Sequence, residues 1–413
     1  MKKLFGIILC FVAFSSASMI GLDALGEEQT LGGMASMAGR GYAGSAKTGE
    51  AEGISLMNPA RIAFDTKVVF NVNFLMEFLS IEHSNTYYST NSITIPSFNL
   101  SFPMGNYGAL GLSLWQRYSS TLDVEADDSS SVINAKMKYQ SSVYEVVPSY
   151  AVRVPYLRNF SLGGSAHFVM GNTERSLSLG PDNSGVSKKD YWATNNSKIT
   201  DYVDGTWEVK NHPAYYSFAL QYRGRQSSYY FSYTTPHTLE NKLNYNFRFS
   251  EIDTLAPTKY TREIDVPMTL ATGMNFRFKK RNNVMLDLQW RSWDDDVENI
   301  GRSFDMDQFT ETQNDILLAA GFQRDGSPLF YDKYRDRITY RCGGWYKGWY
   351  VENAHELGGS IGAGFPLGHK GTTVDLAIQG GKRFVDDGHS WEETFIGLRL
   401  GLMGIGNWGS TAR

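Results

Sequence analysis

The chain has 413 residues, and its 39 Lys and Arg nearly balance its 43 Asp and Glu, giving a formal net charge of −4. That balance provides no electrostatic basis for nucleic acid as a partner. The hydrophobic share of 42% resembles that of a soluble protein. Transmembrane β-barrels share this composition, because half of each strand faces polar surroundings. No stretch reaches the roughly 18–20 apolar residues of a membrane-spanning helix.

The first 18 residues have the pattern of a secretory signal peptide. Lys2 and Lys3 are positively charged, Leu4–Phe14 are apolar, and residues 15–18 are small. This pattern predicts export, with cleavage near Ser18. Cys342 then remains the single cysteine of the mature chain, so no intrachain disulfide is expected.

Residues 19–65 differ in composition from the rest of the chain. Gly32–Gly44 consist mostly of small residues and show no two-residue alternation. Interspersed Met, Tyr and Leu favour close packing in a confined space over a flexible linker. We therefore predict that residues 19–65 form an internal plug.

From residue 66 onward, segments of about ten residues alternate between apolar and polar. In one of them Leu286 and Leu288 alternate with Asp287 and Gln289. A period of two places the two sets on opposite faces of a strand, and an apolar outer face with a polar inner face is typical of an outer-membrane barrel. We predict an all-β fold, a transmembrane antiparallel β-barrel of about 14 strands over residues 66–413. The expected strands lie near 67–80, 94–103, 108–118, 141–154, 159–171, 207–223, 228–240, 263–278, 283–293, 314–323, 337–349, 355–366, 372–384 and 391–408.

The connections between these strands alternate in length and charge. The even-numbered joints, such as 155–158 and 279–282, are mostly short and basic. The odd joints 119–140, 172–206 and 294–313 are long, and the first and last are rich in acidic residues. Short periplasmic turns and long external loops are the rule in such barrels. We therefore expect the outer membrane of a Gram-negative-type bacterium, with both termini in the periplasm. Aromatic residues assigned to the interfacial girdles are Tyr215, Tyr216, Phe218, Tyr222, Tyr229, Tyr230, Phe231 and Tyr233.

Charged residues also occupy positions that the alternation directs inward. Arg291, Arg399, Asp287 and Asp375 are the candidates for a polar network of paired charges in the lumen. Pro148 lies in the middle of a predicted strand, where it removes a ladder hydrogen bond. It is the candidate for a kink or bulge in the wall and for a lateral opening.

The small-residue segment leads into Asn58-Pro59-Ala60, a few residues before the first predicted strand. This arrangement resembles the FadL family of outer-membrane transporters for long-chain fatty acids and hydrocarbons, in which a Gly- and Ala-rich hatch leads into an Asn-Pro-Ala signature. Pro59 fixes its own backbone and directs Asn58 away from helical geometry, giving a rigid turn between plug and wall. The resemblance implies passive diffusion of a hydrophobic small molecule or lipid, with the hatch as gate and a lateral exit.

Other motifs are better explained structurally. Gly358–Gly362 fit the Gly-x-Ser-x-Gly pattern but lie within an alternating strand, where small inward residues would make room for the plug. Asp294–Asp296 are interpreted as part of a solvated acidic loop. We expect no enzyme activity, no cofactor and no metal, and outer-membrane lipids as surroundings.

Three alternatives stay open. One is an outer-membrane adaptor or shuttle that works with secretion-system components, like the related PorV-type barrels. Another is a surface-loop binding or adhesion protein anchored by its barrel, and the third is a soluble β-sandwich or propeller. A continuous apolar path to the plug would favour transport, whereas a lumen closed by salt bridges would favour the adaptor.

Overall fold

The computed structural model describes most of the chain. The described residues are 27–29, 34–49, 52–83, 86–105, 108–127, 133–181, 201–210, 214–248, 258–293, 313–368, 372–385 and 391–406. The predicted signal peptide and Asp294–Asp296 lie outside them. No helix in this part of the chain is long and apolar enough to cross a membrane.

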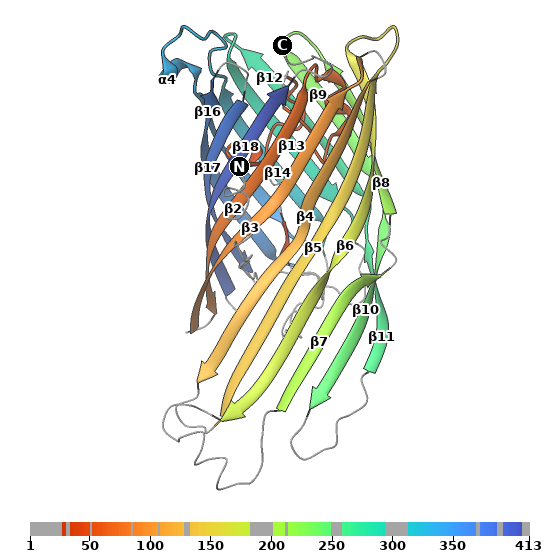
Figure 1. Ribbon diagram of the computed structural model, residues 1–413, viewed down its shortest axis with the longest axis vertical. Coiled ribbons are helices and arrows are strands. Elements are labelled where there is room, and N and C mark those ends of the chain that lie inside the picture. The colour runs from red at the N-terminus through yellow and green to blue at the C-terminus, as the bar shows by residue number, and fades with distance from the viewer. Residues whose placement is uncertain are drawn as a thin grey trace, which may run out of the picture.

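Among the described residues, 14 antiparallel strands close a barrel, in which the last strand, β18, pairs with the first wall strand, β2 (Figure 1). This confirms the predicted fold class and strand number. The wall strands are β2 (Val68–His83), β3 (Thr86–Pro103), β4 (Ala109–Asp127), β5 (Ile133–Arg153), β6 (Phe160–Pro181), β8 (Ala214–Arg223), β9 (Ser227–Thr234), β12 (Thr269–Phe278), β13 (Asn282–Arg291), β14 (Asp315–Arg324), β15 (Thr339–Gly348), β16 (Ala354–Leu367), β17 (Thr372–Val385) and β18 (Trp391–Gly406).

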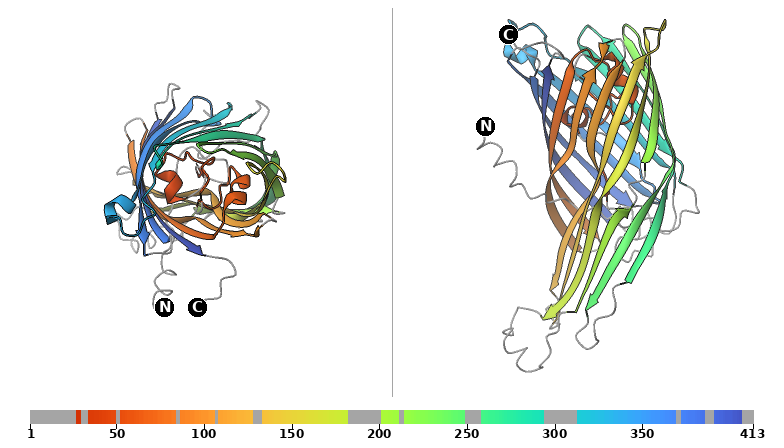
Figure 2. Two further views of the ribbon diagram at one scale, coloured as in Figure 1. Left: turned by 90° about the horizontal axis from the view of Figure 1, so that it is seen from above. Right: turned by 45° about the vertical axis from the view of Figure 1, so that its right-hand side comes forward.

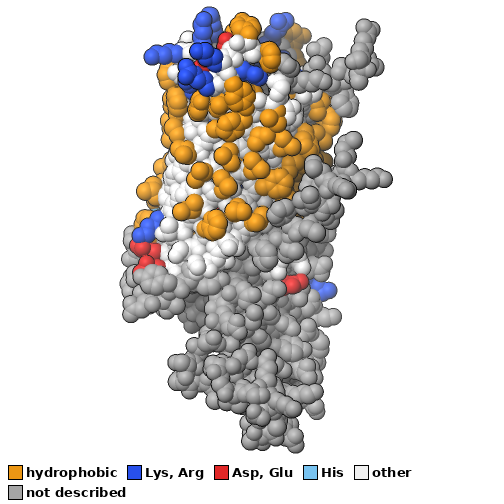
Figure 3. All heavy atoms as spheres, turned by 60° about the vertical axis from the view of Figure 1, so that its left-hand side comes forward, with side chains coloured by type: hydrophobic (Ala, Val, Ile, Leu, Met, Phe, Trp, Pro, Cys, Tyr) orange, Lys and Arg blue, Asp and Glu red, His pale blue; other side chains and the backbone are white. Residues whose placement is uncertain are grey.

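The two faces of the wall differ as the alternation predicts. On β13, Leu286 is 42% exposed while the neighbouring Asp287 is 5% exposed. Apolar side chains cover the outside of the barrel in a broad band, and Lys and Arg gather above it at one end (Figure 3). The thiol of Cys342 is free and exposed on the outward face of β15. An outward apolar band over a polar interior is the arrangement that lipid on the outside requires.

At the other end, part of the wall continues well beyond the rest (Figure 1). Here β6 pairs with β7 (Asp201–Lys210), β7 with β10 (His237–Arg248), and β10 with β11 (Thr258–Val266). The predicted strands 228–240 and 263–278 are therefore each divided, into β9 and β10 and into β11 and β12. The prediction of a loop at residues 119–140 was wrong, because β4 and β5 pair through most of this segment. Its acidic residues resemble a loop because a strand beyond the membrane needs no apolar outer face.

One group of aromatic residues also requires a correction. Tyr216, Phe218, Tyr229 and Phe231 are exposed on the outer face, as girdle residues should be. Tyr215 and Tyr230 are each 3% exposed and face the lumen, because the period of two divides an uninterrupted aromatic run between both faces.

The N-terminal segment lies inside the ring of strands when the barrel is seen along its axis (Figure 2). It includes the two-residue strand β1 (Glu27–Glu28), the helical turn α2 (Ala35–Ala38) and the 3₁₀ helix η1 (Pro59–Phe64). We call residues 34–49 and 52–65 the plug. A further short helix, α4 (Tyr334–Arg337), lies outside the ring, in the connection from β14 to β15.

Candidate functional site: the filled lumen

The Asn-Pro-Ala segment joins the plug to the wall. Asn58 precedes η1, and its side-chain amide donates to the Ser45 carbonyl at 2.9 Å and to Gln221 Oε1 at 2.7 Å. Pro59 occupies the start of η1, where its missing N–H leaves no helical bond unmade. The Ala60 carbonyl accepts a hydrogen bond of 2.9 Å from Ser161 on β6. The segment thus bonds both to the rest of the plug and to the wall.

Glycines in the wall allow the plug backbone to approach it closely. A Cβ added at Gly163 would lie 2.4 Å from the Ala60 nitrogen, and one added at Gly343 would lie 2.1 Å from the Arg40 carbonyl oxygen. A Cβ at Gly321 would also meet that oxygen, at 2.4 Å. Real Cβ atoms do not occur at such distances. These positions require glycine because the space of a side chain is filled by the plug backbone.

The Gly-x-Ser-x-Gly stretch serves the same packing. It lies within β16 and is followed by more strand, and the Ser360 hydroxyl accepts a hydrogen bond of 2.9 Å from the Gly41 N–H. A Cβ added at Gly362 would lie 3.0 Å from the Gly39 Cα. Ser360 and Gly362 of this motif thus make room for α2 and the turn after it.

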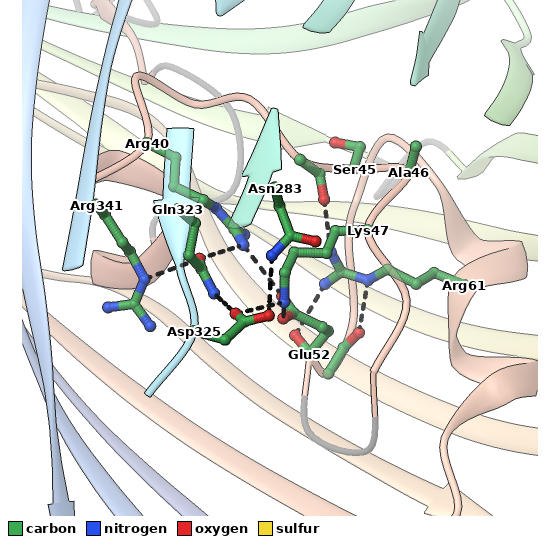
Figure 4. A network of polar contacts seen from close by, with 12 residues as sticks. Arg40, Ser45, Ala46, Lys47, Glu52, Arg61, Asn283, Gln323, Asp325 and Arg341 are labelled. Atoms are coloured by element: carbon green, nitrogen blue, oxygen red, sulfur yellow. Dashed lines mark hydrogen bonds and ion pairs between the residues drawn. The ribbon is translucent and has the colours of Figure 1, made fainter. Parts of the chain in front are cut away.

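Charged side chains tie the middle of the plug to the basic end of the barrel (Figure 4). Glu52 forms ion pairs with Lys47 and, at 3.3 Å, with Arg40. Burial opposes ionisation of Glu52, but these two cations hold the pKa of its carboxyl well below its usual range. Arg40 also donates to Gln323 on β14 at 3.0 Å, and Lys47 lies 3.5 Å from Asp325. This cluster neutralises the plug's charges within the lumen.

A second ionic cluster crosses the lumen through β1. Glu28 pairs with Arg117 of β4 at 2.6 Å and with Arg291 of β13 at 2.5 Å. Burial opposes ionisation of Glu28, but the two guanidinium groups keep the pKa of its carboxyl well below the ordinary range. Glu27 lies 2.6 Å from Arg383 of β17. Burial raises the pKa of the Glu27 carboxyl to about 8. Arg383 offsets this only in part, because its guanidinium also pairs with Glu356 and Glu393.

The four predicted network residues all face the lumen but lie in separate clusters. Arg291 pairs with Glu28 and Asp315, and Asp375 pairs with Arg341 at 2.5 Å. The Asp287 carboxylate accepts the N–H groups of Gly44 and Ser45 at 2.7 and 2.9 Å. Arg399 donates to Gln379 at 3.1 Å and to the Tyr42 hydroxyl at 3.2 Å.

Three of the four therefore contact the N-terminal segment rather than one another. The sequence analysis missed Glu27 and Glu28, since a pair of carboxylates in a segment without periodicity carries no signal of its partners.

The wall is interrupted at prolines. At Pro148 the pairing with β4 continues, while the pairing of β5 with β6 stops at Val146 and resumes at Ser149. A second interruption lies further round the wall. The pairing of β9 with β12 ends at Thr234 and Thr269, and the pairing of β10 with β11 begins at His237 and Val266. The register is unchanged across this gap, so Pro236 and Pro267 stand opposite each other. Neither has an N–H to donate. We call this gap the proline break.

A small cavity of about 40 Å³ lies directly behind the proline break. Thr234 and His237 on one side of the gap and Val266 and Thr269 on the other line it, together with Met57 of the plug. Within the described residues, the Trp115 Nε1 and the His237 Nδ1 are buried without a hydrogen-bond partner. A cavity needs about 10–15 Å³ to hold one water molecule, and one of about 150 Å³ holds benzene, so this cavity has room for water and no room for a hydrocarbon.

The BamG family matches residues 13–411. The chain belongs to the BamG family. This member is similar in structure to a Pseudomonas aeruginosa FadL homologue, with a TM-score of 0.59, 15% identity, and coverage of 93% of this chain and 99% of that one.

It is also similar to the toluene transporter TodX of P. putida, with a TM-score of 0.57, 12% identity, and coverage of 91% and 98%. The Ralstonia pickettii toluene transporter TbuX is similar with a TM-score of 0.53 and 15% identity, and the match covers 90% of this chain and 97% of that one. At these identities the likeness establishes a shared fold, which confirms the expected FadL-like architecture of this BamG-family chain. No curated protein sequence matches the chain.

Proposed function

We propose that this barrel lets hydrophobic small molecules cross the outer membrane passively, with the plug as gate and the proline break as lateral exit. The observation that carries the proposal is the cavity behind the break. Its lining combines both strands of the gap with Met57, so a shift of the plug would open the lumen towards the bilayer.

The surroundings of the break suit an apolar cargo. Tyr216 of β8 lies beside the break, because its N–H donates to the Thr235 hydroxyl at 3.1 Å, and its side chain is 49% exposed on the outer face. A molecule that left the lumen there would pass from protein into hydrocarbon without entering water. The filled lumen represents the closed state, since the cavity is too small for such a cargo.

We further infer that the basic end of the barrel faces the periplasm. The short turns after β3, β5, β8, β12 and β16 lie at this end, and short turns are periplasmic in barrels of this kind. The long extension formed by β7, β10 and β11 then projects outward from the cell.

Deletion of residues 24–55 tests the gate. The barrel should still assemble, as seen by heat-modifiable migration, and its single-channel conductance in planar bilayers should rise. Replacing Asn58 and Pro59 with Ala should lower uptake of a fluorescent long-chain fatty acid without changing the surface level. Unchanged conductance after the deletion would contradict the gate.

One observation favours a second candidate, an outer-membrane adaptor held in place by its barrel. The lumen is crossed by buried ion pairs from β4 to β13 through Glu28, which is the closed arrangement expected of an adaptor. Loss of the protein should then impair delivery of secreted or surface proteins. Uptake of the fatty acid should be the same with and without the protein.

A further inference from the structure

The connection between β14 and β15 presents aromatic side chains outside the barrel. We call residues 325–338 the α4 loop. Tyr331 is 81% exposed, and Phe330 and Tyr334 are more than half exposed. Seen along the barrel axis, α4 lies beyond the ring of strands, on the side of the wall that faces lipid (Figure 2). Exposed aromatic rings at the end of a lipid-facing wall are typical of the membrane interface.

The loop has a defined conformation. The Ser327 N–H donates to the Asp336 carbonyl at 2.8 Å, which closes the loop at its base. The guanidinium of Arg337 lies 5.1 Å from the ring centre of Phe330 and donates to the Gly368 carbonyl in the neighbouring turn at 3.0 Å. The hydroxyl of Tyr340, a lipid-facing residue of β15, donates to the Arg335 carbonyl at 3.4 Å. These contacts hold α4 against the outer side of the wall.

Two cations of the loop are available to a ligand. Lys333 and Arg335 are exposed, and within the described residues no carboxylate forms an ion pair with either. The nearby Asp332 instead accepts a hydrogen bond from the Ser327 hydroxyl. The loop belongs to the cluster of Lys and Arg that lies directly above the apolar band (Figure 3). This is where the phosphate groups of a lipid leaflet would lie.

Below the loop, the outer face of the wall contains an apolar groove of about 710 Å³. Its floor includes the small outward residues Ala320 and Gly344, and its sides include Leu286, Leu318 and Leu357. The floor is low because β14 and β15 carry small side chains at adjacent positions, paired in register as Ala320 and Gly344.

The loop and the groove are separated by a distance that suits one lipid. Along β15, Tyr340 touches the loop and Gly344 and Tyr346 line the groove. Four to six residues span roughly 13–20 Å along the strand at about 3.3 Å each, which is about 10–15 Å along the membrane normal for a strand tilted by roughly 40°. One leaflet of the hydrocarbon core is about 15 Å thick. A phosphate at the loop therefore places an acyl chain at the groove.

We propose that this surface binds one anionic phospholipid of the periplasmic leaflet. The phosphate lies between Lys333 and Arg335, the rings of Tyr331 and Tyr334 lie at the glycerol level, and one acyl chain fills the groove. The proposal uses the orientation inferred above and does not depend on transport. The binding measurement below uses purified protein, so its result is independent of transport and of orientation in the cell.

The test is a lipid titration of the purified, detergent-solubilised barrel followed by native mass spectrometry. Phosphatidylglycerol should bind about tenfold more tightly than phosphatidylcholine with the same chains. Replacing Lys333 and Arg335 with Ala should weaken phosphatidylglycerol binding by about 30-fold, as expected for the loss of two surface cations. The matched control replaces Arg158 and Arg225, exposed in other turns of the same end, and should change the affinity less than twofold.

The groove is tested separately. Ala320→Phe should weaken binding of both lipids, because it occupies the space of the acyl chain. Ala363→Phe, on the outward face of β16 outside the groove, should weaken neither. Equal binding of the two lipids, or equal loss in both charge variants, would overturn the proposal. So would unchanged lipid binding by Ala320→Phe. A photo-crosslinker placed at Tyr331 that captured another protein in place of lipid would overturn it as well.

Discussion

Replacing Gly343 with Ala should loosen the plug while leaving the barrel closed. The added Cβ would lie 2.1 Å from the Arg40 carbonyl oxygen, 2.2 Å from its carbon and 2.6 Å from the Gly41 nitrogen. All three atoms belong to the backbone, so no side-chain rotation relieves the contact. Ordinary contact begins near 3.4 Å, so the turn at Arg40 and Gly41 must move by more than 1 Å.

The magnitude follows from what that movement disrupts. Overpacking by one methyl group typically costs about 1–3 kcal/mol. The shift also strains the bond from the Gly41 N–H to Ser360 at 2.9 Å and the bond from Tyr42 to Gln379 at 2.7 Å. A hydrogen bond of this kind contributes about 1 kcal/mol. A total near 3 kcal/mol raises the equilibrium constant for plug release about 100-fold.

The assay is single-channel recording in planar bilayers, combined with hydrogen exchange of residues 34–49. Gly343→Ala should give more frequent openings and faster exchange, with normal heat-modifiable migration. Gly359→Ala is the matched control, since its Cβ would meet nothing closer than 3.7 Å. Wild-type behaviour of Gly343→Ala would refute the packing argument. The same phenotype in both variants would show that the effect is not specific to the plug.

In two further pairs of neighbouring residues, Gly163 with Gly164 and Glu27 with Glu28, the two members should respond differently to substitution. Gly163→Ala should displace Asn58–Ala60 and lower fatty-acid uptake, whereas Gly164→Ala, with no contact closer than 3.6 Å, should keep wild-type uptake. Glu28→Gln should release β1 at a cost of roughly 3 kcal/mol, since it leaves Arg117 and Arg291 without their shared carboxylate. Because the pKa of Glu28 is lowered, its stabilisation of β1 is present above the ordinary Glu value of 4.5 and is lost on acidification below that value. The pKa of Glu27 is raised to about 8, so its protonated form is favoured when β1 is bound, and the binding weakens as the pH rises from about 4.5 through 8. Glu27→Gln should therefore hold β1 at pH 8 at least as firmly as the wild type, as measured by hydrogen exchange at residues 27–29. Weaker binding of β1 in Glu27→Gln at that pH would contradict this assignment.

The barrel was predictable from the sequence because each wall strand must carry an apolar outer face. Leu286 and Asp287 reveal their faces through the period of two, without knowledge of any partner. Strand ends beyond the membrane were missed, because Ser119–Asp127 of β4 has no such requirement.

Features that depend on pairing could not be found in the sequence. Pro236 and Pro267 stand opposite each other only once β9 and β12 are known to be neighbours. The partners of Glu27 and Glu28 lie 356 and 263 residues away in Arg383 and Arg291. Tyr215 and Tyr230 were assigned to the girdle because composition does not distinguish the two faces of an aromatic run.

Locking the proline break with a reversible disulfide is the most direct test of the central claim. Thr235 and Met268 stand opposite each other in the gap and would be replaced with Cys in a Cys342→Ser background. The control lock joins Ser227 and Phe276, which are paired elsewhere between β9 and β12. If hydrophobic molecules leave through the break, oxidation should abolish fatty-acid uptake in the first variant only, and reduction should restore it. Uptake that is indifferent to the lock, or equally reduced by both locks, would contradict the account.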